Sequence, residues 1–346
     1  MTDSQQCITL WGTPHSLYTG KIRSYLIKKG ISFRERMPAE PAFQQRVVPV
    51  VGAVVVPILE LADGTIVQDT SDMIDHLEQA FPARPMLPTS PVQRVTALLL
   101  DGFGSEGLLA AAMHYRWSYR AEQEQFLRAE FGRSVHAGNN RDERLAAGAQ
   151  MMSYFNSFLP FLGVTPQSIP AHEAAYEALL DALDIHFLSH PYLLGGHPSI
   201  ADFGFMAPLF AHLGRDPYPS ALMKNRAPNV FRWTERMNLA GIGDVEFPGA
   251  GSGAAVQGLG HSAGGGCRGI QCLEPGTACR HSDAYSPGAQ DSSHRRHGRV
   301  SVAWLQNPAR QCATRSVAVR QSPGSGQRSV RCGAAACSRT AQAYRR

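Results

Sequence analysis

The sequence predicts two folded domains: an α/β domain with element order β-α-β-α-β-β-α over residues 1–82, and an all-α domain over residues 92–247. Short apolar runs alternate with helical periodicity in the first segment, whereas the second shows helical periodicity only. Prolines are concentrated at 83–91, which we interpret as a linker. The periodicity stops at Pro248, so residues 248–346 are expected to form a low-complexity, disordered tail.

The elements in the first half of the α/β domain are predicted from the spacing of its apolar residues. Residues Ile8–Trp11 read as a strand. A helix is expected at 16–30, because apolar residues recur there at helical spacing and Gly30 provides a stop. A second strand at 31–35 follows, and then a weakly signalled helix at 38–46.

The second half of this domain begins with a β-hairpin. The dipeptide Asp-Gly at 63–64 marks a tight turn between strands at 57–61 and 65–67. A helix at about 69–79 follows, with Asp69 and the next residue as candidate caps.

The all-α domain is divided by its breaks in periodicity. Residues 92–131 are long and periodic, as two helices or as one that bends around 102–107. Ser199 and Asp202 have the spacing of a capping box at the start of a strongly apolar helix. The other helices are expected at 143–161, 172–188, 199–213 and 228–237.

The net charge of +5 is the sum of two segments with opposite net charges. Residues 1–247 carry 20 Lys and Arg against 25 Asp and Glu, a net charge of −5, together with all 15 phenylalanines. Residues 248–346 carry 13 Arg and three acids, a net charge of +10, and six of the seven cysteines. The basic balance belongs to the tail, so a nucleic-acid partner is not expected for the folded domains.

Three interpretations of the tail stay open. It has too few bulky apolar residues to offset chain entropy, which favours a disordered extension. Its arginines, clustered around 295–299, would suit non-specific contact with nucleic acid. We favour a third interpretation, an out-of-frame or fused translation of GC-rich coding sequence, because Lys, Phe and Met disappear together while Arg, Gly, Ser and Cys increase.

Several classes of protein are excluded. The N-terminus does not read as a secretory signal, and the most apolar stretch, 47–61, is interrupted and shorter than the roughly 20 residues that span a bilayer. Cys7 is the one cysteine of residues 1–247, which excludes a disulfide framework, a CxxC pair and a Cys/His zinc site there. The nine histidines of this segment lack ligand spacing, so no metal is expected. A reducing, cytoplasmic compartment fits best.

Four motifs occur in a fixed order along the folded part. They are Leu-Trp-Gly-Thr-Pro-His-Ser at 10–16 with Lys-Ile-Arg at 21–23, Val56-Pro57, Gln68-Asp69-Thr70 leading into a helix, and the segment from Gly196 to Asp202. With the element order, they resemble the glutathione S-transferases, particularly serine-type bacterial members, over about residues 7–240. The resemblance implies a thioredoxin-like, glutathione-binding N-terminal domain, the all-helical C-terminal domain of this family, and a homodimer.

Ser16 is the catalytic residue that the resemblance implies, because it lies five residues before Lys21, as does the activating serine or cysteine of the serine- and cysteine-type classes. A hydroxyl donor at the positive end of a helix would stabilise the glutathione thiolate. Thr13 and Tyr18 are alternative donors in the same loop, and a purely capping role is the structural alternative for Ser16. Serine rather than cysteine disfavours a glutaredoxin-like reductase.

The resemblance also implies the glutathione-binding residues Val56, Pro57, Asp69 and Thr70. Pro57 stands at the family's cis-proline, where the backbone of Val56 would pair with the cysteinyl unit of glutathione. Asp69 would bind the γ-glutamyl ammonium, and Thr70 with the helix N–H groups its carboxylate. The family usually has Glu or Gln and then Ser here, so the shorter Asp69 predicts a looser or water-bridged contact. An ordinary trans proline and two simple helix caps are the alternatives.

Two further groups of residues have roles that we predict from the sequence. Ser199 and Asp202 are expected to be a structural cap, whose loss costs roughly 1–2 kcal/mol. His114, Tyr115 and Trp117 could face an electrophile pocket, although such an aromatic stripe is more often core or domain interface.

The implied function is attack of the glutathione thiolate on a hydrophobic electrophile bound between the domains, with glutathione as co-substrate. The alternatives are a non-enzymatic binding or scaffold protein of the same fold, and a glutathione-dependent isomerase or dehalogenase. Because the tail replaces the segment that usually packs back on the helical domain, we also expect uncovered apolar surface at 233–239.

Overall fold

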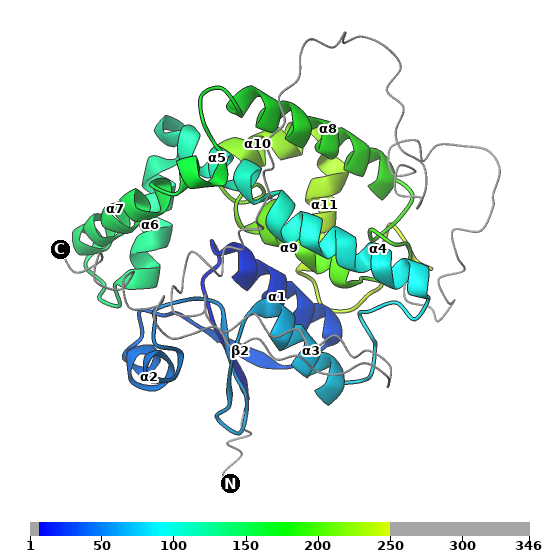
Figure 1. Ribbon diagram of the computed structural model, residues 1–346, viewed down its shortest axis with the longest axis horizontal. Helices are drawn as coiled ribbons and strands as arrows, with labels where there is room; N and C mark the ends of the chain where they lie inside the picture. Colours follow the sequence, from blue (N-terminus) through cyan, green and yellow to red (C-terminus); the bar gives the residue numbers. More distant parts are fainter. Residues whose placement is uncertain (1–6, 250–346) are drawn as a thin grey trace, which may run out of the picture. The chain divides into compact units, whose positions relative to one another are not determined.

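The computed structural model describes residues 7–249, so the tail and its three interpretations lie outside the described residues, apart from Pro248 and Gly249. The predicted element order of the α/β domain is confirmed, and the weak helix expected at 38–46 lies slightly further along the chain (Figure 1). The elements are β1 (Ile8–Trp11), α1 (Leu17–Lys29), β2 (Phe33–Arg36), a π-helical turn (Phe43–Val47), α2 (Val48–Val51), β3 (Ile58–Glu60), β4 (Ile66–Gln68) and α3 (Thr70–Ala80).

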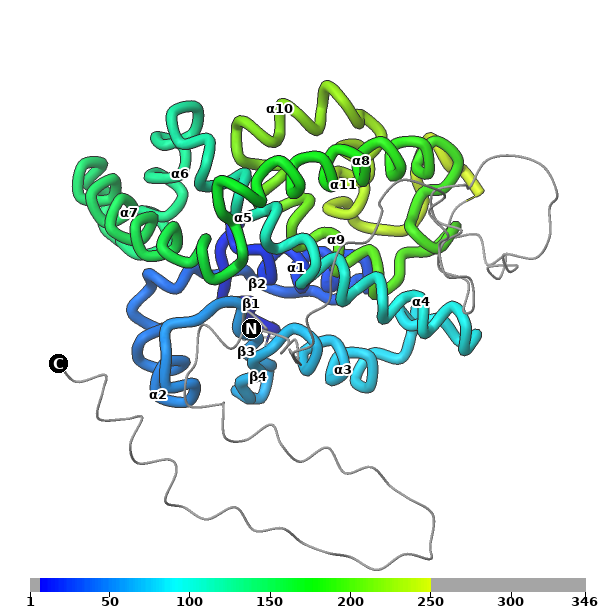
Figure 2. Tube along the Cα trace, turned by 45° about the horizontal axis from the view of Figure 1, so that its top comes forward, coloured from blue at the N-terminus to red at the C-terminus, as the bar shows by residue number. Residues whose placement is uncertain are grey.

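The four strands form one mixed sheet in the order β2-β1-β3-β4 (Figure 2). β1 is parallel to β2 and antiparallel to β3, which forms the predicted hairpin with β4. Since successive side chains of a strand point to opposite faces, Leu10 and Trp11 bury opposite sides of the sheet. Leu10 belongs to the main core with α1 and α3, whereas Trp11 packs in a separate cluster with Phe43 and Val47. Both faces of the sheet are therefore covered.

The helical domain differs from the predicted pattern in three places, one of which is that the helix expected at 143–161 ends at Asn156 and is followed by a 3₁₀ turn. The long periodic stretch bends at a π-helical turn, Phe103–Gly107, as expected, but it breaks again at Tyr119. The sequence pattern does not predict α10, because Pro217 and Pro219 favour a loop; both lie in the first turn, where a missing N–H costs little. The helices are α4 (Pro91–Gly102), α5 (Leu109–Ser118), α6 (Arg120–Val135), α7 (Arg141–Asn156), a 3₁₀ turn (Leu159–Leu162), α8 (Ile169–Phe187), α9 (Ile200–Ala211), α10 (Pro217–Arg226) and α11 (Pro228–Met237).

Helix α9 is almost entirely buried and packs against both α1 and α4. The expected capping box is present at its start, where Asp202 accepts hydrogen bonds from the Ser199 and Leu193 N–H groups, each at 2.9 Å. The Trp233 indole donates to the same carboxylate at 3.2 Å. Burial raises the pKa of Asp202 to about 6 despite these donors. Asp202 therefore joins the start of α9 to α11.

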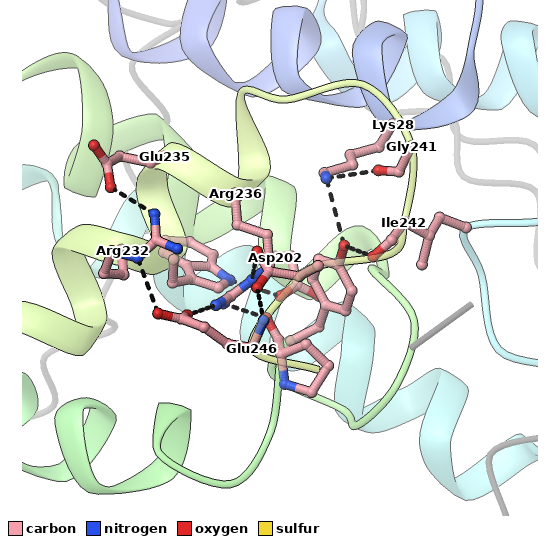
Figure 3. A network of polar contacts seen from close by, with 12 residues as sticks. Lys28, Asp202, Arg232, Glu235, Arg236, Gly241, Ile242 and Glu246 are labelled. Carbon is pink, nitrogen blue, oxygen red and sulfur yellow. Dashed lines mark hydrogen bonds and ion pairs between the residues drawn. The ribbon is translucent and has the colours of Figure 1, made fainter. Parts of the chain in front are cut away.

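The expectation of uncovered apolar surface at 233–239 is wrong for most of that segment. Trp233 and Met237 are fully buried, and only Leu239 among the large apolar residues there is exposed, at 59 %. After α11 the chain passes Lys28 of α1 at Gly241 and then turns back to α11, where Glu246 contacts Arg236 (Figure 3). This segment is held by the Lys28 ammonium, which donates to the Gly241 carbonyl at 2.8 Å, and by ion pairs of Arg236. Polar contacts therefore hold the segment that follows α11 in place, and the spacing of apolar residues in the sequence does not predict such contacts.

One stretch of the described residues, Pro91–Ser118, is long and apolar enough to cross a membrane by length and composition alone. It comprises α4, the π-helical turn and α5. Its α5 part is packed in the core, as in a helix of a globular domain, whereas α4 exposes several apolar side chains.

Candidate active site

A cleft of about 190 Å³ lies where the α/β domain meets the start of the helical domain. Four of the residues expected to bind glutathione, Val56, Pro57, Asp69 and Thr70, line it together, and so does Tyr18. Ser16 and Thr13 are not among the lining residues. The remaining lining residues are Lys21, Val55, Gln68, Ser71, Asp101, Gly102, Ser105 and Glu106.

The α/β domain supplies one wall from two loops. The Val56–Pro57 peptide bond is cis, as predicted, and it leads directly into β3. Asp69 ends the β4–α3 connection with φ 74° and ψ 130°, and its Oδ1 accepts a hydrogen bond from the Ser71 N–H at 2.8 Å. Asp69 therefore caps α3, and the N-terminal turn of that helix faces the cleft through Thr70 and Ser71.

The helical domain supplies the other wall through the junction of α4 and the π-helical turn. Two glycines allow this junction to approach α9 closely, since a Cβ on Gly204 would lie 2.6 Å from the Cα of Asp101 and one on Gly104 would meet the α9 backbone. The buried Lys21 ammonium of α1 then contacts the Asp101 carboxylate at 2.6 Å and the Ser105 hydroxyl at 3.1 Å. These polar contacts join the two domains across the cleft.

Tyr18 lies on the same side as this cross-domain contact. Its hydroxyl donates to the Glu106 carboxylate at 2.8 Å. Burial, and then the charge of Glu106, raise the pKa of Tyr18 far above its ordinary value. Tyr18 is therefore a neutral phenol whose proton is held by a carboxylate.

Ser16 caps α1, and its hydroxyl oxygen accepts a hydrogen bond from the Thr19 N–H at 3.4 Å. Thr13 is buried, with its hydroxyl 3.5 Å from Nε2 of His15. The His15 ring packs on Phe131, and burial keeps the pKa of this imidazole well below its ordinary value. The loop before α1 is thus packed against the helical domain and carries a neutral histidine.

His114, Tyr115 and Trp117 are buried in the helical domain, and none of the three lines this cleft. The two ring nitrogens of His114 contact the Ser118 hydroxyl at 2.8 Å and the Glu173 carboxylate at 2.9 Å. Within residues 7–249, no group of three or more His, Cys, Asp or Glu side chains is arranged to hold a metal ion.

The sequence pattern does not predict the helical wall formed by Asp101, Ser105 and Glu106. The glycine-rich bend at 102–107 predicts a break in a helix, and it carries no local sign that this break faces a cleft. Which residues face the cleft depends on how α4 crosses α9, and that crossing is set by a contact between glycines about 100 residues apart.

Two family models match this chain. The glutathione S-transferase N-terminal domain matches residues 10–85, and the glutathione S-transferase C-terminal domain matches residues 166–236. The chain belongs to the glutathione S-transferase family. Its N-terminal domain is therefore the thioredoxin-like domain of this family, and the helices from α4 onward form the C-terminal one.

Several solved structures are similar to this chain at low sequence identity. A glutathione S-transferase of Methylobacterium radiotolerans in complex with glutathione sulfonate is 18% identical, with 70% of this chain and 93% of that chain covered and a TM-score of 0.39. The β-etherase LigF of a Sphingobium species is 16% identical, with 67% and 94% covered and a TM-score of 0.44. A glutathione transferase homologue from Sulfitobacter with bound glutathione is 15% identical, with 67% and 93% covered and a TM-score of 0.39. The comparison with curated proteins found no match.

Proposed function

We propose that this protein is a glutathione transferase that binds glutathione in the cleft and directs its thiolate at a hydrophobic electrophile. The observation that carries the proposal is that Val56, Pro57, Asp69 and Thr70, which come from separate motifs, line a single cleft. Membership of the family supports glutathione as the co-substrate.

Each group has a role that follows from its chemistry. The backbone of Val56, just before β3, would pair with the cysteinyl unit of the tripeptide. The N–H groups at the start of α3, with the Thr70 hydroxyl, would bind the γ-glutamyl carboxylate, because a helix N-terminus attracts anions. The Asp69 carboxylate would hold the γ-glutamyl ammonium while Oδ1 keeps its bond to Ser71.

Ser16 does not itself line the cleft but lies two residues before Tyr18, which does, and we propose Ser16 as the group that stabilises the sulfur. Its oxygen accepts the Thr19 N–H, and a hydroxyl that accepts one bond can still donate its own proton to a thiolate. The Tyr18 hydroxyl already donates to Glu106, so it would have to break that bond to serve the sulfur. Ser16 also stands at the start of α1, where the helix dipole favours an anion.

The experiment that tests this role measures steady-state conjugation of glutathione to a chromogenic electrophile, together with glutathione affinity by calorimetry. Ser16→Ala should lower kcat by about a hundred- to a thousandfold, with glutathione affinity changed much less, as for the loss of one donor to a developing anion. Tyr18→Phe is the matched control and should retain most of kcat. A larger loss of kcat in Tyr18→Phe than in Ser16→Ala would assign the role to Tyr18. Saturable glutathione binding by the wild type without turnover would indicate a binding protein.

We further propose that the protein acts as a cytoplasmic homodimer. Support comes from α4, where Val92, Val95, Leu98 and Leu99 are exposed on a helix of the domain that lines the cleft. Exposed apolar side chains at helical spacing are typical of a surface that is covered by another chain.

A further inference from the structure

A buried guanidinium from the helical domain reaches the loop before α1. Arg116 of α5 is 2 % exposed, and its partner Asp216, at the start of α10, is completely buried. The pair is bidentate: Nε lies 2.6 Å from Oδ2 of Asp216, and Nη2 lies 2.8 Å from Oδ1. This fork geometry fixes the plane of the guanidinium.

Two further N–H groups of Arg116 donate to backbone carbonyls. Nη1 donates to the His15 carbonyl at 2.8 Å, and Nη2 also donates to the Ala211 carbonyl at the end of α9, at 2.9 Å. One side chain therefore connects α5, α9, α10 and the loop before α1. Only arginine has enough donors in a fixed plane for this set of acceptors.

The His15–Ser16 peptide is held on both of its polar groups. Its carbonyl accepts from Arg116, and its N–H, which belongs to Ser16, donates to the Thr13 carbonyl at 3.2 Å. Because a peptide unit is planar, fixing its C=O and N–H fixes the orientation of the whole plane. That plane sets the direction in which Ser16 enters α1.

We propose that Arg116 is a positioning residue for Ser16, acting through the His15–Ser16 peptide and without contact with the substrate. This inference rests on the proposed function, in which Ser16 stabilises the sulfur of glutathione. Stability alone does not require the ion pair, because apolar residues of similar volume often replace a buried pair without loss. What an apolar replacement cannot supply is the donor to the His15 carbonyl.

The first test compares Arg116→Met with the wild-type full chain. The readouts are the pH dependence of kcat, the pKa of the bound glutathione thiol from thiolate absorbance, and glutathione affinity. Loss of the donor should raise that pKa by about one unit, which is a tenfold lower thiolate fraction below the pKa, while affinity changes less than about twofold. A purely structural role would lower the folded fraction without moving the pH profile, and an unmoved profile overturns the proposal.

Arg116→Lys separates positioning from charge. Lysine keeps the positive charge but cannot donate to Asp216, the Ala211 carbonyl and the His15 carbonyl in one plane. A pKa shift similar to that of Arg116→Met supports positioning, whereas full rescue by lysine would make the effect one of charge and overturn the proposal. Asp216→Asn breaks one arm of the fork that fixes the guanidinium plane, so it should raise the pKa of the bound thiol in the same direction as Arg116→Met, and an unmoved pKa would contradict the positioning role.

A measurement without glutathione distinguishes failure of this inference from failure of the proposed function. In Ser16→Cys, the introduced thiol reports the environment of position 16 directly, through the pH dependence of its alkylation by iodoacetamide, followed by mass spectrometry of the peptide that carries it. Its pKa should lie below the ordinary value of about 8.5 and return toward it when Arg116→Met or Arg116→Lys is added. An identical pKa in all three proteins contradicts the positioning role even if glutathione never binds.

Discussion

Asp69 combines an unfavourable backbone conformation with a functional position. Its φ of 74° lies in a region that residues other than glycine avoid, at a cost on the order of 1–3 kcal/mol. The conformation joins β4 to α3 so that the Asp69 side chain caps the helix and the residue lines the cleft. A residue chosen for stability alone would be glycine, so the aspartate is best explained by its carboxylate.

The variant Asp69→Gly tests this explanation. Glycine accepts a positive φ freely and is only a few tenths of a kcal/mol poorer as an N-cap. Thermal unfolding should therefore show an unchanged or higher melting temperature, while calorimetry shows glutathione affinity reduced by about tenfold or more. A stable variant with unchanged affinity would remove Asp69 from the binding site.

Lys28 predicts a pH dependence of stability. Burial, and then the nearby Arg236, lower its pKa to about 8, while the unfolded chain keeps the ordinary value near 10.5. Between these two pKa values the unfolded state binds more protons than the folded state. The contribution of Lys28 to the free energy of unfolding therefore rises as the pH increases from 8 toward 10. Below pH 8, Lys28 is charged in both states and the cost of burying it is fully present.

Urea unfolding of the wild type and of Lys28→Met at pH 7, 8, 9 and 10 measures this effect. The difference in the free energy of unfolding, wild type minus variant, should increase by on the order of 1 kcal/mol between pH 8 and pH 10. A difference that stays constant across this range would show that Lys28 keeps its ordinary pKa.

At the scale of elements, glycines decide how closely helices cross. α6 and α7 form an adjacent pair (Figures 1 and 2) in which a Cβ on Gly148 would lie 2.1 Å from the Arg128 carbonyl oxygen, and one on Gly132 would lie 2.2 Å from that of Arg144. Neither glycine has a positive φ, so the space between the helices, not the backbone conformation, requires them.

We expect Gly148→Ala to destabilise the protein by about 1–3 kcal/mol, because the methyl group meets backbone that cannot move aside. Gly102→Ala is the matched control: a Cβ there meets nothing within 4 Å, and alanine favours the helix by up to about 1 kcal/mol. Chemical denaturation of both variants measures the difference. Equal effects of the two substitutions would contradict the close approach of α6 and α7.

The sequence predicted elements whose signals are local and missed features that depend on distant contacts. The strands, the cis Val56–Pro57 bond and the Ser199–Asp202 capping box follow from short patterns or from the family resemblance. Two features join segments that are far apart in the chain: the helical wall of the cleft, and the contact of Arg116 with the His15 carbonyl. Local sequence patterns therefore do not predict them. The same reason explains the wrong expectation at 233–239, where later residues fold back.

At the scale of the whole molecule, the net charge and the exposed apolar residues of the folded domains indicate which kind of partner they bind. Because residues 1–247 carry a net charge of −5, we do not expect the folded domains to bind nucleic acid. The exposed apolar residues of α4 favour a protein partner, which the proposed homodimer supplies.

Leu99→Glu should therefore dissociate the dimer, because it places a charge on an apolar face, with Leu99 itself 61 % exposed in one chain. Phe161→Glu is the control, since Phe161 is 77 % exposed on the 3₁₀ turn, away from α4 in the sequence. Light scattering coupled to size exclusion gives the mass of each protein. A monomeric wild type, or dissociation by both variants alike, would contradict the α4 interface.

Calorimetric titration of the full chain with glutathione is the most direct test of whether the cleft lined by Val56, Pro57, Asp69 and Thr70 binds this tripeptide. We expect saturable binding with one glutathione per chain, weakened by about tenfold or more in Asp69→Ala and little changed in Glu173→Gln, which alters a carboxylate outside the cleft. Absence of saturable binding to the folded wild type would show that the cleft is not a glutathione site.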